Sequence, residues 1–348
     1  MNRGITFALV SAILFGISTP LAKALVATVS PLLLAGLLYA GSGLGLALVI
    51  AVRRASMRSG WSPSMPRVEE WRWLAAAIFF GGVLGPAALM YGLVTSAAST
   101  ASLLLNLEAV FTALLAWFLF KENFDRPIAL GMAAIVGGGA LLAWVPGQRA
   151  GASLGLLLIV AACLCWALDN NLTRKVSASD AVMVACLKGL VAGAVNIALA
   201  LALGAKLPAL PALGAAALVG FFGYGVSLVL FVLALRHLGT ARTSAYFSVA
   251  PFFGAALSLL LVGEPITWQL VAAGLLMATG VWLHLTERHE HLHRHAPQEH
   301  SHSHVHDEHH QHSHDSWDGA EPHTHVHRHA PLVHAHPHYP DLHHRHPH

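Results

Sequence analysis

The sequence predicts an all-α integral membrane protein: ten transmembrane helices in two inverted five-helix repeats, followed by a disordered histidine-rich tail. Three observations predict this fold class. The 348-residue chain is 55% hydrophobic and only 11% charged, whereas soluble domains are about 25% charged. Apolar runs long enough to cross a bilayer recur along the chain between short polar breaks. Residues 286–348 hold 23 of the 25 histidines and 9 of the 17 acidic residues, which leaves the remainder too apolar to fold in water.

Ten apolar runs predict the transmembrane helices, each close to the 17–25 residues that a spanning helix needs. The first run continues past Leu25 and is too long for a signal-peptide core, so we interpret it as an uncleaved helix. The breaks at Thr95-Ser96 and at Arg236 to Gly239 are very short and predict tight helical hairpins. In chain order, the predicted helices are Ile5–Ala27, Leu32–Val52, Trp73–Val94, Ala97–Phe120, Ile128–Val145, Leu154–Leu172, Ala181–Leu203, Ala212–Leu235, Thr240–Val262 and Trp268–Leu285.

Lysine and arginine in the loops predict the orientation. A cytoplasmic N-terminus places 12 loop residues of this kind inside and two, Arg149 and Lys206, outside. Positively charged loops are enriched on the cytoplasmic side of membrane proteins. We therefore expect a multi-pass protein of the bacterial inner (plasma) membrane. Ten crossings would return the C-terminus and the tail to the cytoplasm.

The two halves of the apolar region resemble each other. Residues 79–81 (Phe-Phe-Gly) recur as residues 221–223, and residues 121–123 (Lys-Glu-Asn) align with residues 263–265 (Gly-Glu-Pro). Five helices per half is an odd number, so the halves cross the membrane in opposite senses and are expected to form a substrate site between them. A match by shared composition is the alternative interpretation. The expected domains are 1–146 (first repeat), 147–287 (second repeat) and 288–348 (tail).

Glu108 is the most informative single residue because it lies near the middle of the fourth predicted helix. A charged group at the bilayer centre costs about 2.5–3.5 kcal/mol on insertion scales, so such residues face a cavity or a partner. As a carboxylate, Glu108 could bind a cation, and as a carboxylic acid it could carry a proton. The alternative is a glutamate that only fastens helices. Glu122 and Glu264, at helix ends, are interpreted as structural.

Further polar residues are candidates for contact with a substrate or coupling ion. Lys188 lies about eight residues into the seventh helix, with Asn196 on the same face two turns later. Lys23 lies in the outer part of the first helix. Either lysine could pair with Glu108 or bind a substrate carboxylate, although Lys23 could instead extend to the outer interface. Asn106 completes this set.

Cys165 and Asp169 are four residues apart and share a face of the sixth helix. A thiolate beside a carboxylate could form part of a site that admits a metal. The alternative is that Cys163 and Cys165 are small packing residues, and that Asp169 pairs with Arg174 or Lys175. Three cysteines, all in apolar runs, argue against a disulfide framework.

The tail has the composition of a disordered, metal-binding segment. Many prolines and few apolar residues preclude a packed core. Neutral imidazole is a ligand for zinc, nickel, cobalt and copper, and most of these rings are neutral in cytoplasm because the unperturbed pKa is about 6.5. A purification tag would be a single short run. The predicted metal ligands are His291, His293, His295, His300, His302, His304, His306, His309, His310, His312, His314, His323, His325, His327 and His329, with Cys165 in the core.

Three stretches resemble the drug/metabolite transporter superfamily in its EamA-type ten-helix branch. Residues 13–23 (Ile-Leu-Phe-Gly through Lys23) are similar to the family's first-helix pattern. Residues 106–123 and 248–265 are similar to its paired repeat ends. The resemblance covers about residues 5–285. It implies secondary transport, commonly export of amino acids, metabolites or drugs, and some members with a histidine-rich tail export nickel or cobalt.

The leading hypothesis is an efflux carrier for a divalent transition metal (nickel, cobalt or zinc), driven by protons or membrane potential, with the tail capturing ions. The alternative is an exporter of amino acids or other small metabolites, with the tail as a metal sensor or buffer. A membrane-anchored metal store is disfavoured because an anchor needs only one or two helices. Without a phosphate-binding loop or a catalytic constellation, neither ATP-driven pumping nor an enzyme is expected. No cofactor beyond metal and no nucleic-acid partner is expected; membrane lipid surrounds the chain, and a homodimer is left open.

Overall fold

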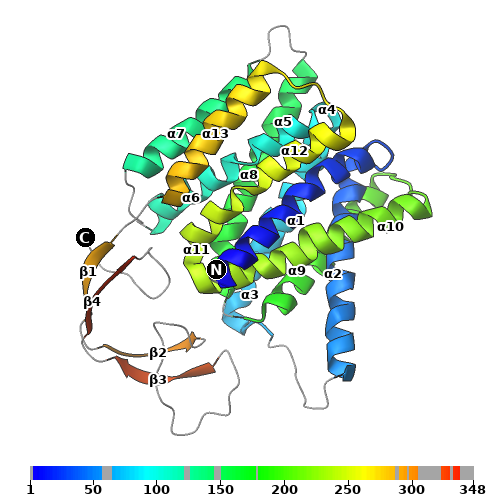
Figure 1. Ribbon diagram of the computed structural model, residues 1–348. Helices are drawn as coiled ribbons and strands as arrows, with labels where there is room; N and C mark the ends of the chain where they lie inside the picture. Colours follow the sequence, from blue (N-terminus) through cyan, green and yellow to red (C-terminus); the bar gives the residue numbers. More distant parts are fainter. Residues whose placement is uncertain are drawn as a thin grey trace.

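The computed structural model describes residues 3–56, 65–120, 126–144, 150–177, 179–286 and four tail segments, 290–295, 298–304, 323–329 and 332–337. Its helices pack side by side into one bundle (Figure 1). The first half contains α1 (Arg3–Val26), α2 (Pro31–Ser56), η1 (Val68–Glu70), α3 (Trp71–Ala77), η2 (Ile78–Leu84), α4 (Gly85–Thr95), α5 (Ala98–Leu104), α6 (Leu107–Phe120) and α7 (Arg126–Ala143). The second half contains α8 (Ala150–Thr173), η3 (Arg174–Val176), α9 (Ala181–Ala202), α10 (Leu210–Val219), η4 (Gly220–Val226), α11 (Ser227–Phe247), α12 (Ala250–Val262) and α13 (Trp268–Thr286).

The described helices are those of a multi-pass membrane protein. Eight helical stretches are long and apolar enough to cross a bilayer, and two shorter apolar helices, Ile128–Ala143 and Trp268–Leu283, lie where the fifth and tenth spans are predicted. The count of ten crossings therefore stays a prediction. One expected break is absent, since α11 continues as helix through residues 236–239. These four residues contain no proline, and a single glycine inside a helix costs only about 1 kcal/mol.

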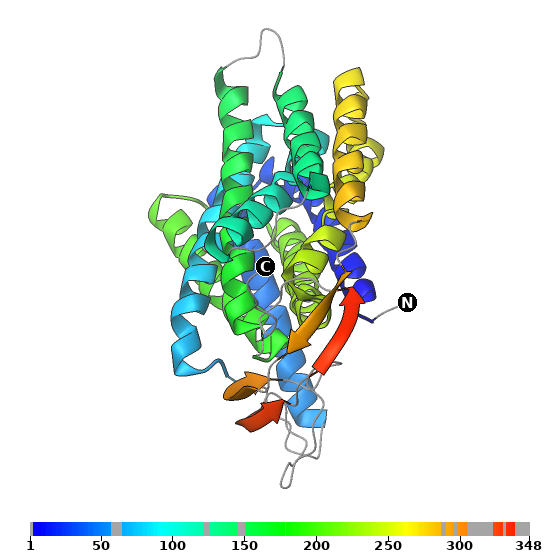
Figure 2. The same ribbon diagram turned by 90° about the vertical axis from the view of Figure 1, so that its left-hand side faces the viewer.

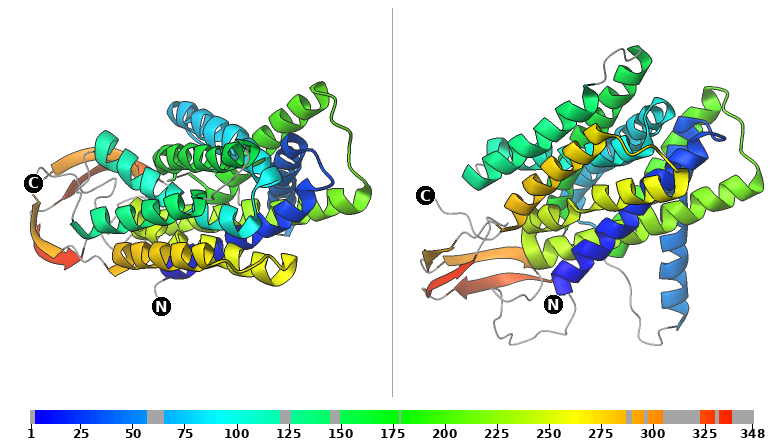
Figure 3. Two further views of the ribbon diagram at one scale, coloured as in Figure 1. Left: turned by 90° about the horizontal axis from the view of Figure 1, so that it is seen from above. Right: turned by 45° about the horizontal axis from the view of Figure 1, so that its top comes forward.

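Helix packing has the pattern expected of two similar halves. α2 packs along α9, and α7 packs along α13. α1 packs against α11 and α12, just as α8 packs against α4 and α6. When each helix is replaced by its counterpart in the other half, the α2–α9 and α7–α13 contacts stay the same, and the contacts of α1 become those of α8. Figure 3 shows α1 starting and α13 ending at the same end of the bundle.

The α2–α9 contact is close because both helices present glycine there. A Cβ added to Gly189 would lie only 2.6 Å from the Cα of Gly43. Small residues allow backbones to approach closely in membranes, where packing rather than the hydrophobic effect holds helices together. The contact consequently has no room for an additional methyl group.

The repeated Phe-Phe-Gly sequences lie in two π-helical segments, η2 and η4. A π-helical turn bonds residue i to i+5 and leaves carbonyl groups for other partners, often near functional sites. In η2, the Gly81 carbonyl accepts from Tyr39 Oη at 2.6 Å and from Trp166 Nε1 at 3.0 Å, and the Gly82 carbonyl accepts from Asn196 Nδ2 at 3.0 Å. Buried side chains from three other helices thus stabilise the irregular backbone.

Two helices expected to be continuous are broken in the structure. Leu105 and Asn106 form a turn between α5 and α6, and Ser248 and Val249 form a turn between α11 and α12. The Ser248 hydroxyl donates to the Ser244 carbonyl at 2.8 Å, and the second residue of α12 is Pro251, which lacks an N–H group. The first break places Glu108 in the first turn of α6, where the helix dipole favours negative charge.

Glu264 connects the halves at one end of the bundle. Its carboxylate accepts from the backbone N–H groups of Ala98 at 2.7 Å and Ser99 at 2.9 Å. These two N–H groups belong to the first residues of α5 and have no hydrogen-bond acceptor within the helix. This contact supports the structural interpretation of Glu264, whereas residues 121–123 lie outside the described residues.

The tail differs from the expected disorder in its described segments. These form four strands, β1 (Glu290–His295), β2 (Gln298–His304), β3 (His323–His329) and β4 (Leu332–Pro337). β1 pairs with β4 and β2 pairs with β3, both antiparallel, outside the helical bundle (Figure 2). Alternating His-X-His sequences match the two-residue period of a strand. Ribbons of two strands are only marginally stable in water.

Candidate functional site: a cavity with two lobes

A buried cavity with two adjoining lobes lies between the halves of the bundle. The first has a cavity volume of about 60 Å³ and contains Asp169 and Lys188, so we call it the ion-pair lobe. The second has a cavity volume of about 20 Å³ and lies at the two helix breaks, so we call it the helix-break lobe. Both lobes are lined by Phe15 of α1, Glu108 of α6, Asn170 of α8, and Phe231 and Phe247 of α11.

The ion-pair lobe contains a buried salt bridge between α8 and α9. Lys188 Nζ lies 2.6 Å from Asp169 Oδ1 and 2.8 Å from Oδ2. Thr173 Oγ1 donates to Asp169 Oδ1 at 2.8 Å and lies 3.2 Å from the ammonium group. Lys188 is 1% exposed. A buried ion pair is tolerated only with such well-satisfied geometry.

The sequence did not suggest this pairing. Lys188 contacts Asp169 and not Glu108, which was one of its possible partners. Asp169 contacts a lysine from the next helix. The sequence could not show this, because the two residues are 19 positions apart on different helices that meet only through tertiary packing.

Six aromatic residues are among the 13 that line the lobe around the salt bridge. The Phe15 ring centroid lies 5.5 Å from that of Trp166, 5.8 Å from that of Tyr224 and 5.4 Å from that of Phe247. Tyr39 and Tyr224 are 5.3 Å apart. Ring faces attract cationic and apolar groups. Sequence analysis missed these rings as site residues, although Phe15 lies in the first-helix pattern and Tyr224 in the π-helical segment η4.

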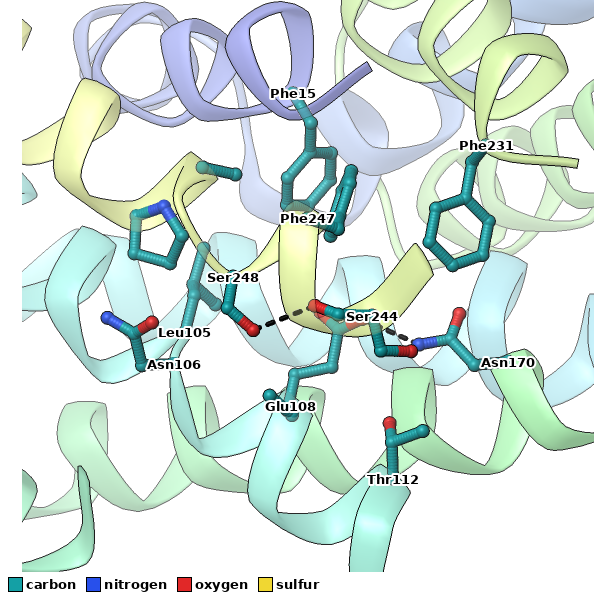
Figure 4. A pocket seen from close by; sticks show the side chains of 13 residues that line it. Phe15, Leu105, Asn106, Glu108, Thr112, Asn170, Phe231, Ser244, Phe247 and Ser248 are labelled. Atoms are coloured by element: carbon teal, nitrogen blue, oxygen red, sulfur yellow. Dashed lines mark hydrogen bonds between the residues drawn. The ribbon is translucent and has the colours of Figure 1, made fainter. Parts of the chain in front are cut away.

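Glu108 lies where the two lobes meet (Figure 4). It is 9% exposed, and its Oε1 atom accepts a hydrogen bond from Asn170 Nδ2 at 2.7 Å. The amide is neutral, so this carboxylate has a weaker partner than Asp169 has. Asn170 follows Asp169 directly in α8, so one turn of α8 carries Asp169 and also contacts Glu108.

Three other predicted residues have different positions. Lys23 donates from Nζ to the carbonyls of Leu93 at 2.5 Å and Val94 at 3.4 Å, so its hydrogen bonds go to the backbone and not to Glu108, one of the partners left open by the sequence. Asn106 lines the helix-break lobe. Asn196 binds η2, as described above, and does not line either lobe.

The described residues provide no metal centre. They contain no group of three histidine, cysteine, aspartate or glutamate side chains able to hold an ion. Cys165 is a free, half-buried thiol, and its Cβ lies beside Gly85, as expected of a packing residue. His291, His293 and His295 lie in β1, and His300, His302 and His304 lie in β2. His323, His325, His327 and His329 lie in β3, while His306, His309, His310, His312 and His314 lie outside the described residues.

A solved structure described only as "Crystal structure of protein" has a similar fold. Its TM-score to this chain is 0.60 at 18% identity, and the match covers 80% of this chain and 95% of that chain. At this identity the likeness shows the fold alone.

Sequence relatives are named as transporters. An "Uncharacterized transporter" of Methanothermobacter thermautotrophicus is 29% identical over 285 residues, 78% of this chain and 82% of the relative. A "Probable amino-acid metabolite efflux pump" of Salmonella typhimurium is 29% identical over 206 residues, 54% of this chain and 67% of the relative. The model of the EamA-like transporter family matches twice, at residues 2–144 and 153–286. Two matches in tandem, over a bundle of apolar helices around a buried cavity, place this chain in the EamA-like transporter family.

Proposed function

We propose that the protein exports small organic solutes that carry an amino group, with amino acids and related metabolites as the principal class. The observation that carries this proposal is the Asp169–Lys188 pair inside an aromatic cavity. A zwitterionic solute can replace both partners, its ammonium group facing the carboxylate and its carboxylate facing the lysine. The aromatic wall suits an apolar or cationic remainder. The name of the Salmonella relative supports the same class.

The proposed mechanism is alternating access around this cavity. Similar repeats that rock against each other expose a central site first to one side and then to the other. The loop charges support a cytoplasmic N-terminus, and the ten apolar runs of the sequence support ten crossings of a bacterial inner membrane. Glu108, at the junction of the lobes, is the proposed coupling residue. A reporter that is active only outside the cytoplasm, fused after His348, should stay inactive, and its activity would contradict this orientation.

Counterflow in proteoliposomes tests the substrate class. We expect vesicles preloaded with an unlabelled amino acid or amine to accumulate the labelled solute, and vesicles preloaded with a sugar not to do so. The Glu69→Gln variant, which changes an exposed acid outside the cavity, should show the same counterflow as the wild type. Absence of counterflow for every amine and amino acid, with well-folded protein, would contradict the proposal.

Efflux of nickel, cobalt or zinc is a second candidate, favoured by the 23 histidines of residues 286–348. A tail that holds several weakly bound ions raises their local concentration near the core. Deleting the chain after Arg288 should then raise the metal concentration for half-maximal flux and leave the maximal rate nearly unchanged. Acidification below about pH 6.5 should act similarly, because protonated imidazole does not bind metal. If neither the full-length protein nor the truncated protein transports metal, this candidate is eliminated.

A further inference from the structure

Three buried oxygen atoms in the helix-break lobe have no hydrogen-bond partner among the described residues. They are Asn106 Oδ1, Thr112 Oγ1 and Ser244 Oγ. All three residues line this lobe together with Glu108 (Figure 4). Asn106 is 1% and Thr112 is 3% exposed. Buried polar groups are almost always paired, so three unpaired oxygens in the same lobe as a carboxylate indicate a ligand.

The chemistry of the lobe selects a positively charged ligand. The Asn106 amide nitrogen already donates to the Leu103 carbonyl at 3.2 Å, which leaves Oδ1 as an acceptor. The Asn170 amide nitrogen already donates to Glu108, and Lys188 is paired with Asp169. Hydroxyl, amide and carboxylate oxygens are ligands for hard cations, whereas transition metals prefer nitrogen and sulfur.

We propose that the helix-break lobe binds an alkali-metal cation of the Na⁺ type, held by oxygens of Glu108, Thr112, Ser244 and Asn106. One carboxylate matches one positive charge. The bound ion would neutralise Glu108, which reduces the cost of a carboxylate in the apolar interior of the bundle. A divalent ion would leave a net charge there.

The backbone arrangement supports this site. Glu108 and Thr112 are four residues apart on α6 and therefore share a face. Ser244 comes from the last turn of α11, in the other half of the chain. A cation at this position bridges the halves at the breaks of both helices, and discontinuous helices are typical of ion sites in secondary transporters. Ion binding would thus be sensitive to how the halves are arranged.

The test is binding of radioactive Na⁺ to the purified full-length protein in nanodiscs. We expect saturable binding that weakens about tenfold in Thr112→Val and in Ser244→Ala, which corresponds to about 1.4 kcal/mol each. Thr243→Val is the matched control: Thr243 has a buried, unpaired hydroxyl on the same helix but does not line the lobe. Thr112→Ser keeps the oxygen and should retain near wild-type affinity.

Two results would overturn the site. Folded wild-type protein without saturable Na⁺ binding would show that these oxygens hold only water. Equal affinity in Thr112→Val, Ser244→Ala and Thr243→Val would place the ion elsewhere. If a valine variant does not fold, the comparison of Thr112→Ser with Ser244→Ala decides. The ion site rests on the proposed function. If the site is wrong but the proposed function is right, amino-acid counterflow persists in Na⁺-free vesicles, so the two failures are distinguishable.

Discussion

The ion-pair lobe and the helix-break lobe share walls but hold their carboxylates differently. Asp169 faces a lysine ammonium group and a threonine hydroxyl, in a fully buried cluster between α8 and α9. Glu108 receives one hydrogen bond from a neutral amide and lines the same lobe as three unpaired oxygens. One acid therefore has a counter-charge supplied by the protein itself, and the other is available to a mobile cation.

This difference assigns different roles to two acidic residues in one cavity. Removing a partner from a buried ion pair leaves an uncompensated charge and costs about 3–5 kcal/mol. Neutralising a carboxylate that has no fixed counter-charge costs little stability but removes its exchangeable ligand. Stability and transport measurements should consequently separate the two lobes.

The largest effect on stability is expected in the ion-pair lobe. Lys188→Met leaves the Asp169 carboxylate buried and unpaired, so the free energy of unfolding should fall by about 3–5 kcal/mol. Adding Asp169→Asn should recover most of this loss and not restore transport. The melting temperature of the detergent-solubilised protein and counterflow measure the two properties. A Lys188→Met variant as stable as the wild type would show that water reaches Asp169.

A smaller loss is expected where η2 meets the ion pair. A Cβ at residue 81 would overlap the Asp169 carboxylate, so Gly81→Ala should displace it from Lys188 and destabilise the protein by about 1–3 kcal/mol. Gly214→Ala is the matched control because no atom lies within 4 Å of an added Cβ there. Equal melting temperatures for the two variants would contradict the close packing of η2 on α8.

The smallest effect on stability is expected at Glu108. Glu108→Gln keeps the shape and a partner for Asn170, so the free energy of unfolding should change by less than about 1 kcal/mol. Counterflow should nevertheless fall at least tenfold, equivalent to about 1.4 kcal/mol, because the exchangeable charge is lost. Near wild-type counterflow would show that Glu108 only packs, and the contrast between the lobes would disappear.

Several features of the site were predictable from single positions along the chain. Glu108 is predictable as a site residue because a carboxyl group in the middle of an apolar run needs a polar surrounding. The Phe-Phe-Gly repeats indicated matching segments, which are the two π-helices. The partner of Lys188 and the breaks beside Asn106 and Ser248 were not predictable, because they depend on residues far apart in sequence.

Hydropathy and composition predict the apolar helices, the tandem halves and the histidine-rich tail, because these are local properties of each segment that govern its insertion into a membrane. Which charges meet depends instead on how the helices pack. Asp169 turns to Lys188 because α8 and α9 both pack against η2, and Glu108 keeps a neutral partner because the break before α6 brings it beside Asn170. Inside the bundle, each carboxylate interacts with whatever the neighbouring helices bring within about 3 Å, and hydrogen-bond geometry, not sequence distance, selects that partner.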